Sequence, residues 1–256
     1  MENKAFCQAA APLSAPELVK GYCPRATIVF FCINCYCSCS RCAQVDAKIN
    51  IHDIPMKLIL ISNPVNLVDE LETIVRMFES GLTYFHLRKP DFTKEEYELF
   101  LKAIPLKYRK YIIIHHYHEL IYHYELQGIH HTRRTNFQPI QLQYKVHQSK
   151  SFHSISEIKH NQFPYDYVFL SPIYDSISKQ GYRSNFDFST LADWLSRKPH
   201  SFKIVALGGI NENNLAEVKQ IGFDGVAILG IIWNEVKINK RLEKFKTIQA
   251  KIENLN

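Results

Sequence analysis

Cysteine is absent from residues 43–256 of this 256-residue chain, because all seven cysteines lie at or before Cys42. A single domain rarely distributes cysteine in this way, so we place a boundary after Cys42, near Met56. Residues 56–256 alone are numerous enough for one domain with a large core. The sequence therefore predicts an extension at 1–55 and one folded domain at 56–256.

Long apolar runs and dense basic runs are also missing. The apolar stretch at 26–37 is about half of the ~20 residues that span a bilayer. The net charge is +6, from 31 basic and 25 acidic residues, and Lys and Arg form no dense run. A mild positive excess fits an anionic small ligand. We therefore expect no nucleic-acid partner and no membrane association.

The cysteines of the extension do not have the spacing of a two-pair zinc motif. Lys20 and Arg25 precede the apolar stretch, which leaves a signal peptide as one interpretation, although no small-residue cleavage site follows cleanly. The stretch lacks an amphipathic period, so we favour an unstructured extension, or upstream sequence with Met56 as the true start. On that interpretation the protein is cytoplasmic.

From Met56 onward, short apolar runs alternate with helical periods. The runs predict strands at 58–61, 84–87, 111–114, 128–131, 146–151, 167–170, 203–207 and 226–229. Thr93-x-x-Glu96 and Ser154-x-x-Glu157 are capping boxes that open helices. Eight units of about 25 residues predict an α/β fold, a single (β/α)₈ TIM barrel. A doubly wound sheet is the alternative, disfavoured because no Gly-x-Gly-x-x-Gly follows the first strand.

The active site of such a barrel lies at the carboxyl ends of its strands. Gly208-Gly209 follows the seventh predicted strand, and Leu229-Gly230 ends the eighth. Glycines there let a ligand approach the backbone, and exposed N–H groups can bind an anion. We interpret the two turns as a phosphate cradle, with a simple tight turn as the alternative.

His153 is the candidate acid/base residue. It stands at the end of the fifth predicted strand, directly before the second capping box, which fixes its backbone. Histidine, with a usual pKa near 6.5, suits proton exchange with a ligand. The alternative is a capped surface histidine.

Other polar residues also fall at strand ends, where they are candidates for substrate binding. Lys179 belongs to the long polar loop at 171–186, which could close over a ligand or simply be a solvated surface loop. The candidates are His86, Arg88, Lys89, His115, His116, Ser151 and Lys179.

Paired histidines at 115–116 and 130–131 raise the question of a metal. Adjacent side chains on a strand face opposite sides, so the two pairs supply only two inward imidazoles. A zinc site takes three or four protein ligands, and no inward carboxylate is evident. The sequence therefore predicts no metal site.

The ordered set of motifs resembles the thiamine phosphate synthase family, which includes the thiazole tautomerases. The resemblance covers 56–256. It is carried by HLRK (86–89), IIHH (113–116), GIH (128–130), SFHSISE (151–157), SPIYDSISK (171–179), LGGI (207–210) and DGVAIL (224–229). It implies a barrel that binds thiazole phosphate at the 208–209 and 229–230 turns. Barrels of this family commonly dimerise, so a homodimer is one expectation.

For a synthase, the resemblance implies a pyrimidine pyrophosphate as second substrate and Mg²⁺ to assist departure of its pyrophosphate. The expected residues are Arg and Lys after the second strand, Asn-Asp after the third and Asp after the fourth. Arg88 is present, but Pro90 holds the usual lysine position and His115-His116 replace Asn-Asp. The segment 131–135 has no carboxylate, although carboxylates are the usual protein ligands of Mg²⁺.

Thiazole tautomerases need no metal, and they shift protons on a carboxythiazole phosphate through a histidine that matches His153. We therefore expect a metal-independent thiazole tautomerase without a cofactor. Arg88, Lys89 and Lys179 would hold the substrate carboxylate or another anion. The alternatives are a thiamine phosphate synthase with an altered Mg²⁺ site, and a non-catalytic binder of thiazole or thiamine phosphates.

Overall fold

The computed structural model describes residues 55–132, 146–175, 186–197 and 201–256. The predicted extension, apart from Pro55, and the candidate Lys179 lie outside the described residues. The described ranges thus lie in the part of the chain that the sequence predicts to be one folded domain, and the predicted boundary near Met56 stays a prediction.

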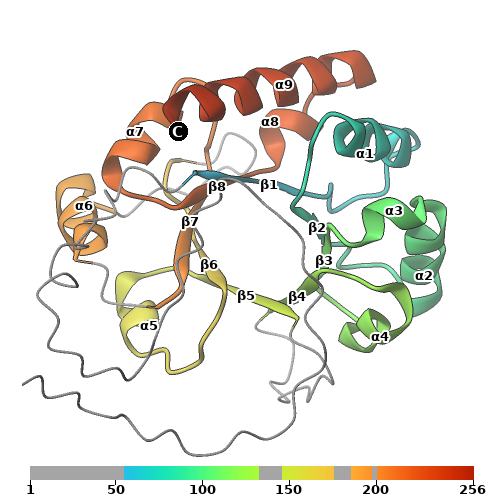
Figure 1. Ribbon diagram of the computed structural model, residues 1–256, viewed down its shortest axis with the longest axis horizontal. Helices are drawn as coiled ribbons and strands as arrows, with labels where there is room; N and C mark the ends of the chain where they lie inside the picture. The colour runs from blue at the N-terminus through green and yellow to red at the C-terminus, as the bar shows by residue number, and fades with distance from the viewer. Residues whose placement is uncertain (1–54, 133–145, 176–185, 198–200) are drawn as a thin grey trace, which may run out of the picture. The chain divides into compact units, whose positions relative to one another are not determined.

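Eight parallel strands close into a barrel in the order β1 to β8, with β1 paired to β8 (Figure 1). The predicted (β/α)₈ TIM barrel is confirmed. The strands are β1 (Lys57–Ile61), β2 (Phe85–Leu87), β3 (Ile112–Ile114), β4 (Gly128–His131), β5 (His147–Phe152), β6 (Tyr167–Leu170), β7 (Lys203–Leu207) and β8 (Gly225–Ile228).

Helices follow the strands on the outside of the barrel (Figure 1). They are α1 (Glu70–Glu79), α2 (Lys94–Ala103), α3 (Leu106–Arg109), the 3₁₀ turn η2 (His118–Leu120), α4 (Ile121–Tyr124), α5 (Ile155–Lys159), α6 (Phe188–Ser196), α7 (Leu215–Ile221), α8 (Gly230–Trp233) and α9 (Ile238–Leu255). The four-residue helices α3 and α8 were not predicted, because one turn is too short to show a helical period.

Strands β1, β3, β6, β7 and β8 are largely apolar on both faces because both faces are covered. Alternate residues such as Leu60, Val168 and Ile204 belong to the large core cluster that includes the apolar faces of the helices. The residues between them form a separate inner cluster: Ile59, Ile61, Ile113, Tyr167, Phe169, Val205 and Ala227. The period of two thus decides which side chains enter the barrel.

Both predicted capping boxes begin helices. At α2 the box is complete, since Thr93 accepts from the Glu96 N–H and the Glu96 carboxylate accepts from the Thr93 N–H. At α5 the Ser154 hydroxyl accepts from the Glu157 N–H at 3.1 Å. The Glu157 carboxylate accepts from the His153 N–H at 2.8 Å, one residue earlier than a capping box requires. The backbone of His153 is therefore fixed from α5.

The last helix is tied to the first by a buried arginine. Arg241 of α9 is 4% exposed, and its guanidinium donates to the Asp69 carboxylate at 2.8 Å and to the Glu235 carbonyl at 2.7 Å. Figure 1 shows α9 lying beside α1 and α7. This ion pair joins α9, near the end of the described residues, to the start of α1.

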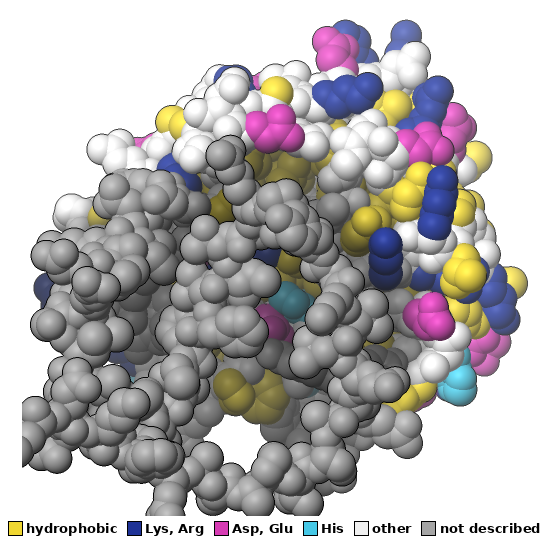
Figure 2. All heavy atoms as spheres, viewed as in Figure 1, with side chains coloured by type: hydrophobic (Ala, Val, Ile, Leu, Met, Phe, Trp, Pro, Cys, Tyr) yellow, Lys and Arg dark blue, Asp and Glu magenta, His cyan; other side chains and the backbone are white. Residues whose placement is uncertain are grey.

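The outer helices carry charges of both signs. Figure 2 shows basic and acidic side chains mixed over α1, α2 and α9, and several form pairs along one helix, such as Lys102–Glu98 and Lys240–Glu243. Within the described ranges, no helix combines the length and the apolar character needed to cross a bilayer.

The contact between β4 and β5 depends on the absence of a side chain at Gly128. A Cβ added there would lie 2.6 Å from the His147 Cβ, closer than packed atoms allow. We expect Gly128→Ala to lower the free energy of unfolding by ~3 kcal/mol, the upper range for overpacking. Urea denaturation measures the change, with the exposed Lys246→Ala as a control that stays within ~0.5 kcal/mol. Equal stabilities of the two variants would contradict the packing argument.

Candidate functional site

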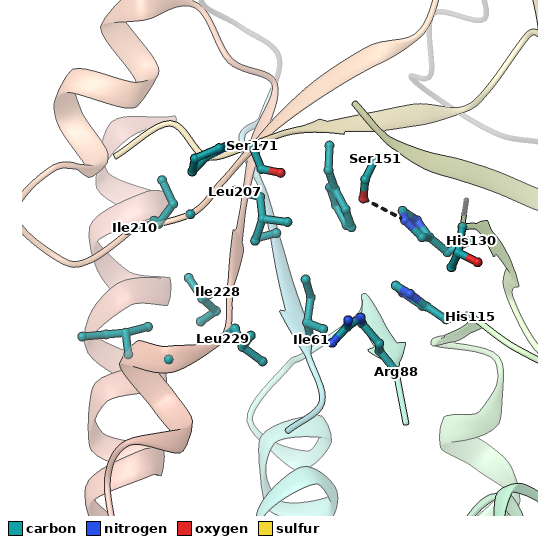
Figure 3. Close-up of a pocket in the computed structure, with 18 of the residues that line it drawn as sticks. Ile61, Arg88, His115, His130, Ser151, Ser171, Leu207, Ile210, Ile228 and Leu229 are labelled. Atoms are coloured by element: carbon teal, nitrogen blue, oxygen red, sulfur yellow. Dashed lines mark hydrogen bonds between the residues drawn. The ribbon is translucent and has the colours of Figure 1, made fainter. Parts of the chain in front are cut away.

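The carboxyl ends of the strands open into a cavity of about 710 Å³. In Figure 3, Arg88, His115, His130 and Ser151 enter the cavity from one side, and Leu207, Ile210 and Leu229 from the other. Most of the predicted site residues line it: Arg88, His115, His116, Ser151, His153, Gly208, Gly209, Leu229 and Gly230. Lys89 and His86 are the described candidates that do not.

The turn after β7 requires both of its glycines. Gly208 and Gly209 have φ values of +97° and +66°, a region that side chains other than glycine rarely adopt. A Cβ on Gly208 would lie 2.9 Å from the Pro172 Cα, and a Cβ on Gly209 would lie 2.6 Å from the Tyr174 Cβ. The geometry of a tight turn is therefore enough to explain both glycines. Phosphate binding depends instead on whether the N–H groups of the turn are available.

The carbonyl groups of this turn are used by the protein itself. The Gly208 carbonyl accepts from the Tyr174 N–H at 3.1 Å, and the Gly209 carbonyl accepts from the Asn214 side chain at 3.0 Å. These bonds hold the turn in one orientation against the segment after β6.

The N–H groups of the two turns are available to a ligand. Among the described residues, the N–H groups of Gly209 and Ile210 have no acceptor. Helix α8 begins at Gly230, so the N–H groups of Gly230 and Ile231 have no partner within the helix. All four residues line the cavity. The arrangement can bind a phosphate through backbone N–H groups, as barrels with glycines after strands seven and eight do.

His153 presents a ring nitrogen that is able to take a proton. Its Nδ1 lies 3.0 Å from the Ser171 carbonyl oxygen. A carbonyl only accepts, so the neutral ring carries its hydrogen on Nδ1 and leaves a lone pair on Nε2. The side chain is exposed and lines the cavity. The hydrogen bond thus selects the tautomer that a general base requires.

Arg88 places a positive charge at the cavity wall. Its backbone is held by Ser62, whose hydroxyl accepts from the Arg88 N–H at 2.8 Å and donates to the Arg88 carbonyl at 3.0 Å. Within the described ranges its guanidinium forms no ion pair. An arginine without a carboxylate partner beside a cavity is suited to bind an anionic group of a ligand.

Lys89 does not reach the cavity, which corrects its expected role in substrate binding. Alternation after β2 turns Arg88 inward and Lys89 outward, where its amino group pairs with the Glu70 carboxylate and donates to the Val65 carbonyl at 3.0 Å. Both charged side chains are fully buried. Burial lowers the pKa of Lys89 and raises the pKa of Glu70, while their mutual attraction opposes both shifts. The pair joins β2 to α1.

His86 lies beneath the cavity rather than in its wall, so no direct substrate contact is evident for it. It is completely buried, its Nδ1 is 2.9 Å from His115 Nε2, and its Nε2 is hydrogen-bonded to the Tyr167 hydroxyl. His115 in turn stacks on His130, with ring centroids 4.2 Å apart. Three imidazoles from β2 and from the ends of β3 and β4 therefore meet at the floor of the cavity.

His130 was not among the predicted site residues, although it belongs to one of the motifs that carry the resemblance. Its Nδ1 lies 2.8 Å from the Ser149 hydroxyl and its Nε2 lies 3.0 Å from the Ser151 hydroxyl (Figure 3). The count of two inward imidazoles was wrong, because it considered only the paired histidines and omitted His86. Alternation along β2, which places His86 on the same face as Arg88, was the signal that could have found the third.

The three imidazoles are neutral. Burial holds the pKa of His86, His115 and His130 well below the usual value, and neighbouring histidines, for His130 those at 118 and 131, lower it further. Arg88 adds to the effect at His115 and His130, so the floor of the cavity carries no charge while its wall is positive.

The magnesium ion that the resemblance implies for a synthase does not fit these residues. In the described lining of the cavity, the carboxylate is that of Glu235, which pairs with Lys244 at 3.0 Å. The sequence segments 133–145 and 176–185 contain no Asp or Glu. Mg²⁺ is usually held by one or two carboxylates together with waters and phosphates. The ends of β3 and β4 offer imidazoles instead.

A family model described as thiamine monophosphate synthase matches residues 58–232. The thiamine-phosphate synthase of Staphylococcus haemolyticus is 33% identical over 82 residues, which are 32% of this chain and 38% of that protein. That of Staphylococcus epidermidis is 32% identical over 80 residues, 31% of this chain and 37% of that protein. The chain therefore matches less than two-fifths of the length of these curated relatives.

Solved structures extend the similarity to the whole barrel. A thiamine phosphate pyrophosphorylase from Bacteroides thetaiotaomicron is 37% identical with a TM-score of 0.69, covering 78% of this chain and 99% of that one. One from Pyrococcus furiosus is 19% identical with a TM-score of 0.64, covering 80% and 99%. At that identity, the second shares the fold alone.

The buried pair of Lys89 and Glu70 gives a test of the structural role of Lys89. We expect Glu70→Gln to lower the free energy of unfolding by ~3–5 kcal/mol, because it leaves a buried ammonium without its carboxylate. Gln keeps an oxygen for the Asn63 N–H that Glu70 binds at 3.0 Å. Adding Lys89→Met removes the unpaired charge and should recover most of the loss in urea denaturation. A Lys89→Met variant of normal stability that lost ligand affinity would instead support a binding role.

Proposed function

The chain belongs to the thiamine monophosphate synthase family, and from this premise we propose that it acts on a thiazole phosphate as a tautomerase in which His153 moves the proton. The observation that supports this most directly is the proton-free Nε2 of His153 at the cavity. The lack of carboxylates suited to Mg²⁺ favours this reaction over a synthase.

A tautomerisation needs one group that removes a proton and returns one elsewhere on the same molecule. His153 Nε2 takes the proton and becomes an imidazolium, while Nδ1–H stays bonded to the Ser171 carbonyl, which stabilises the positive charge. The imidazolium then returns a proton from Nε2 to the second atom of the substrate. Atoms and charge balance, and no cofactor is consumed.

The cavity has a place for both ends of a carboxythiazole phosphate. The phosphate would bind the N–H groups of Gly209, Ile210, Gly230 and Ile231, where two turns converge. The carboxylate would meet Arg88 on the opposite wall (Figure 3). A volume of about 710 Å³ lies within the range of small-molecule sites.

The second candidate is thiamine phosphate synthesis from the thiazole phosphate and a pyrimidine pyrophosphate. The printed names of the relatives favour it, and 37% identity to the Bacteroides pyrophosphorylase extends over most of the domain. It would have to bind its pyrophosphate without the carboxylates that the resemblance implies. A non-catalytic binder is the third candidate, in which the cradle works and His153 does not.

Replacing the base tests the proposal. We expect His153→Ala in the full chain to lower kcat by ~10²–10⁴-fold, the usual contribution of a general acid/base, with substrate Kd within about threefold. His160→Ala, which removes an exposed histidine of the same segment, is the matched control. Proton NMR follows the tautomers, and calorimetry gives Kd. Unchanged turnover, or lost binding of substrate, would contradict the role of His153.

Arg88 predicts a selective effect on the carboxylate. We expect Arg88→Met to weaken binding of the carboxythiazole phosphate by about 10–100-fold, the value of hydrogen bonds to a charged group. Binding of the thiazole phosphate that lacks the carboxylate should change by less than about twofold. Calorimetric titration of both ligands measures the difference. An equal loss for the two ligands would place Arg88 at the phosphate instead.

A further inference from the structure

We propose that His86, His115 and His130 form a binding site for a borderline divalent transition-metal ion, of which Zn²⁺ is the representative, with the fourth position open to the cavity. This site differs in ligands and in metal class from a magnesium site for pyrophosphate. It does not depend on the tautomerase proposal, because it rests on the imidazoles alone.

The three imidazoles are close enough to share one ion. One ring nitrogen of each lies within 4.8 Å of those of the other two, and His86 Nδ1 and His115 Nε2 are 2.9 Å apart. Zn–N bonds of ~2.0–2.1 Å place tetrahedral ligand nitrogens about 3.4 Å from one another. The rings of His115 and His130, which are stacked with their planes 21° apart, have to rotate before both lone pairs point at one ion. Without metal, one ring hydrogen joins His86 Nδ1 to His115 Nε2 in a hydrogen bond. The metal ion would replace this hydrogen between the two nitrogens.

Two of the three imidazoles already have the hydrogen-bond partner that a ligating histidine needs. A ligating histidine usually donates its second ring N–H to a hydrogen-bond acceptor, which fixes the ring. His86 turns Nε2 to the Tyr167 hydroxyl, and His130 turns Nδ1 to the Ser149 hydroxyl at 2.8 Å. These bonds leave His86 Nδ1 and His130 Nε2 as ligand atoms, once the Ser151 hydroxyl, 3.0 Å from His130 Nε2, turns away.

The chemistry of the donors selects the class of metal. A histidine binds metal only in its neutral form, and all three of these rings are buried away from water. Imidazole suits Zn²⁺, Ni²⁺ and Cu²⁺, whereas Mg²⁺ and Ca²⁺ prefer carboxylate, carbonyl and water oxygens. Three protein ligands with one open position are the arrangement of zinc sites that bind water or a ligand.

The open position faces the ligand. His115 and His130 line the cavity, and His86 closes the site from below. Arg88 stands at the same wall, and its charge opposes a cation at the floor. An anion in the cavity would offset this repulsion, so we expect inorganic phosphate to strengthen metal binding.

Cobalt binding tests the proposal directly, because four-coordinate Co²⁺ absorbs visible light strongly. The protein is the full chain with its seven cysteines replaced by serine, which removes thiolates as competing ligands. We expect one equivalent of Co²⁺ to give this spectrum and Zn²⁺ to displace it. Mg²⁺ should not compete. X-ray absorption should show imidazole nitrogens at ~2.0 Å.

Two variants and one control test which residues bind the metal ion. His115→Ala should abolish the spectrum, and Tyr167→Phe should weaken Co²⁺ affinity about 10–100-fold, as loss of a partner to a ligating histidine does. His160→Ala, which removes an exposed imidazole outside the cluster, should leave affinity unchanged. Circular dichroism checks that each variant is folded. Absence of the spectrum in the cysteine-free chain, or its persistence in a folded His115→Ala variant, would overturn the proposal.

Discussion

The alternation of side chains along short parallel strands decides what the inside of this barrel contains. Closure of the sheet leaves one face of every strand for the interior, and residues two apart share that face. On β2 this places His86 below Arg88, and on β5 it places Ser149 below Ser151. The floor of neutral imidazoles and hydroxyls, and the cation at the wall, both follow from this single constraint. A shift of one residue in any of these strands would turn its polar groups into the helix layer.

In the tautomerase that we propose, the division of charge within the cavity would let it hold an anion and still move protons. Free N–H groups and Arg88 provide positive potential where phosphate and carboxylate would lie. Buried imidazoles at the floor add hydrogen bonds without charge. The backbone of His153 is fixed by Glu157, and its ring is held by the Ser171 carbonyl. This exposed ring presents the lone pair of Nε2 to the cavity. Binding and proton transfer are thus assigned to different groups.

Much of this arrangement could be predicted from the sequence, and the failures have physical reasons. Apolar runs located most of the eight strands, with the run at 146–151 the weakest, and Thr93-x-x-Glu96 located the start of α2, because burial and capping leave local patterns. Lys89 was placed in the site because nothing local shows that Glu70, nineteen residues earlier, pairs with it. The meeting of His86 with His115 and His130 depends on barrel closure, which no local pattern records. The residues 1–54 and 176–185 lie outside the described structure, so the predictions for the extension and for Lys179 stay predictions.

We propose that this cavity isomerises a thiazole phosphate instead of joining it to a pyrimidine. One NMR experiment tests it most directly, with the full chain, carboxythiazole phosphate, pyrimidine pyrophosphate and Mg²⁺ in the same tube. A tautomerase predicts faster interconversion of the thiazole tautomers, undiminished when Mg²⁺ is left out, and no thiamine phosphate. Thiamine phosphate formed by this protein alone would contradict the claim and identify the chain as a synthase with an unusual pyrophosphate site.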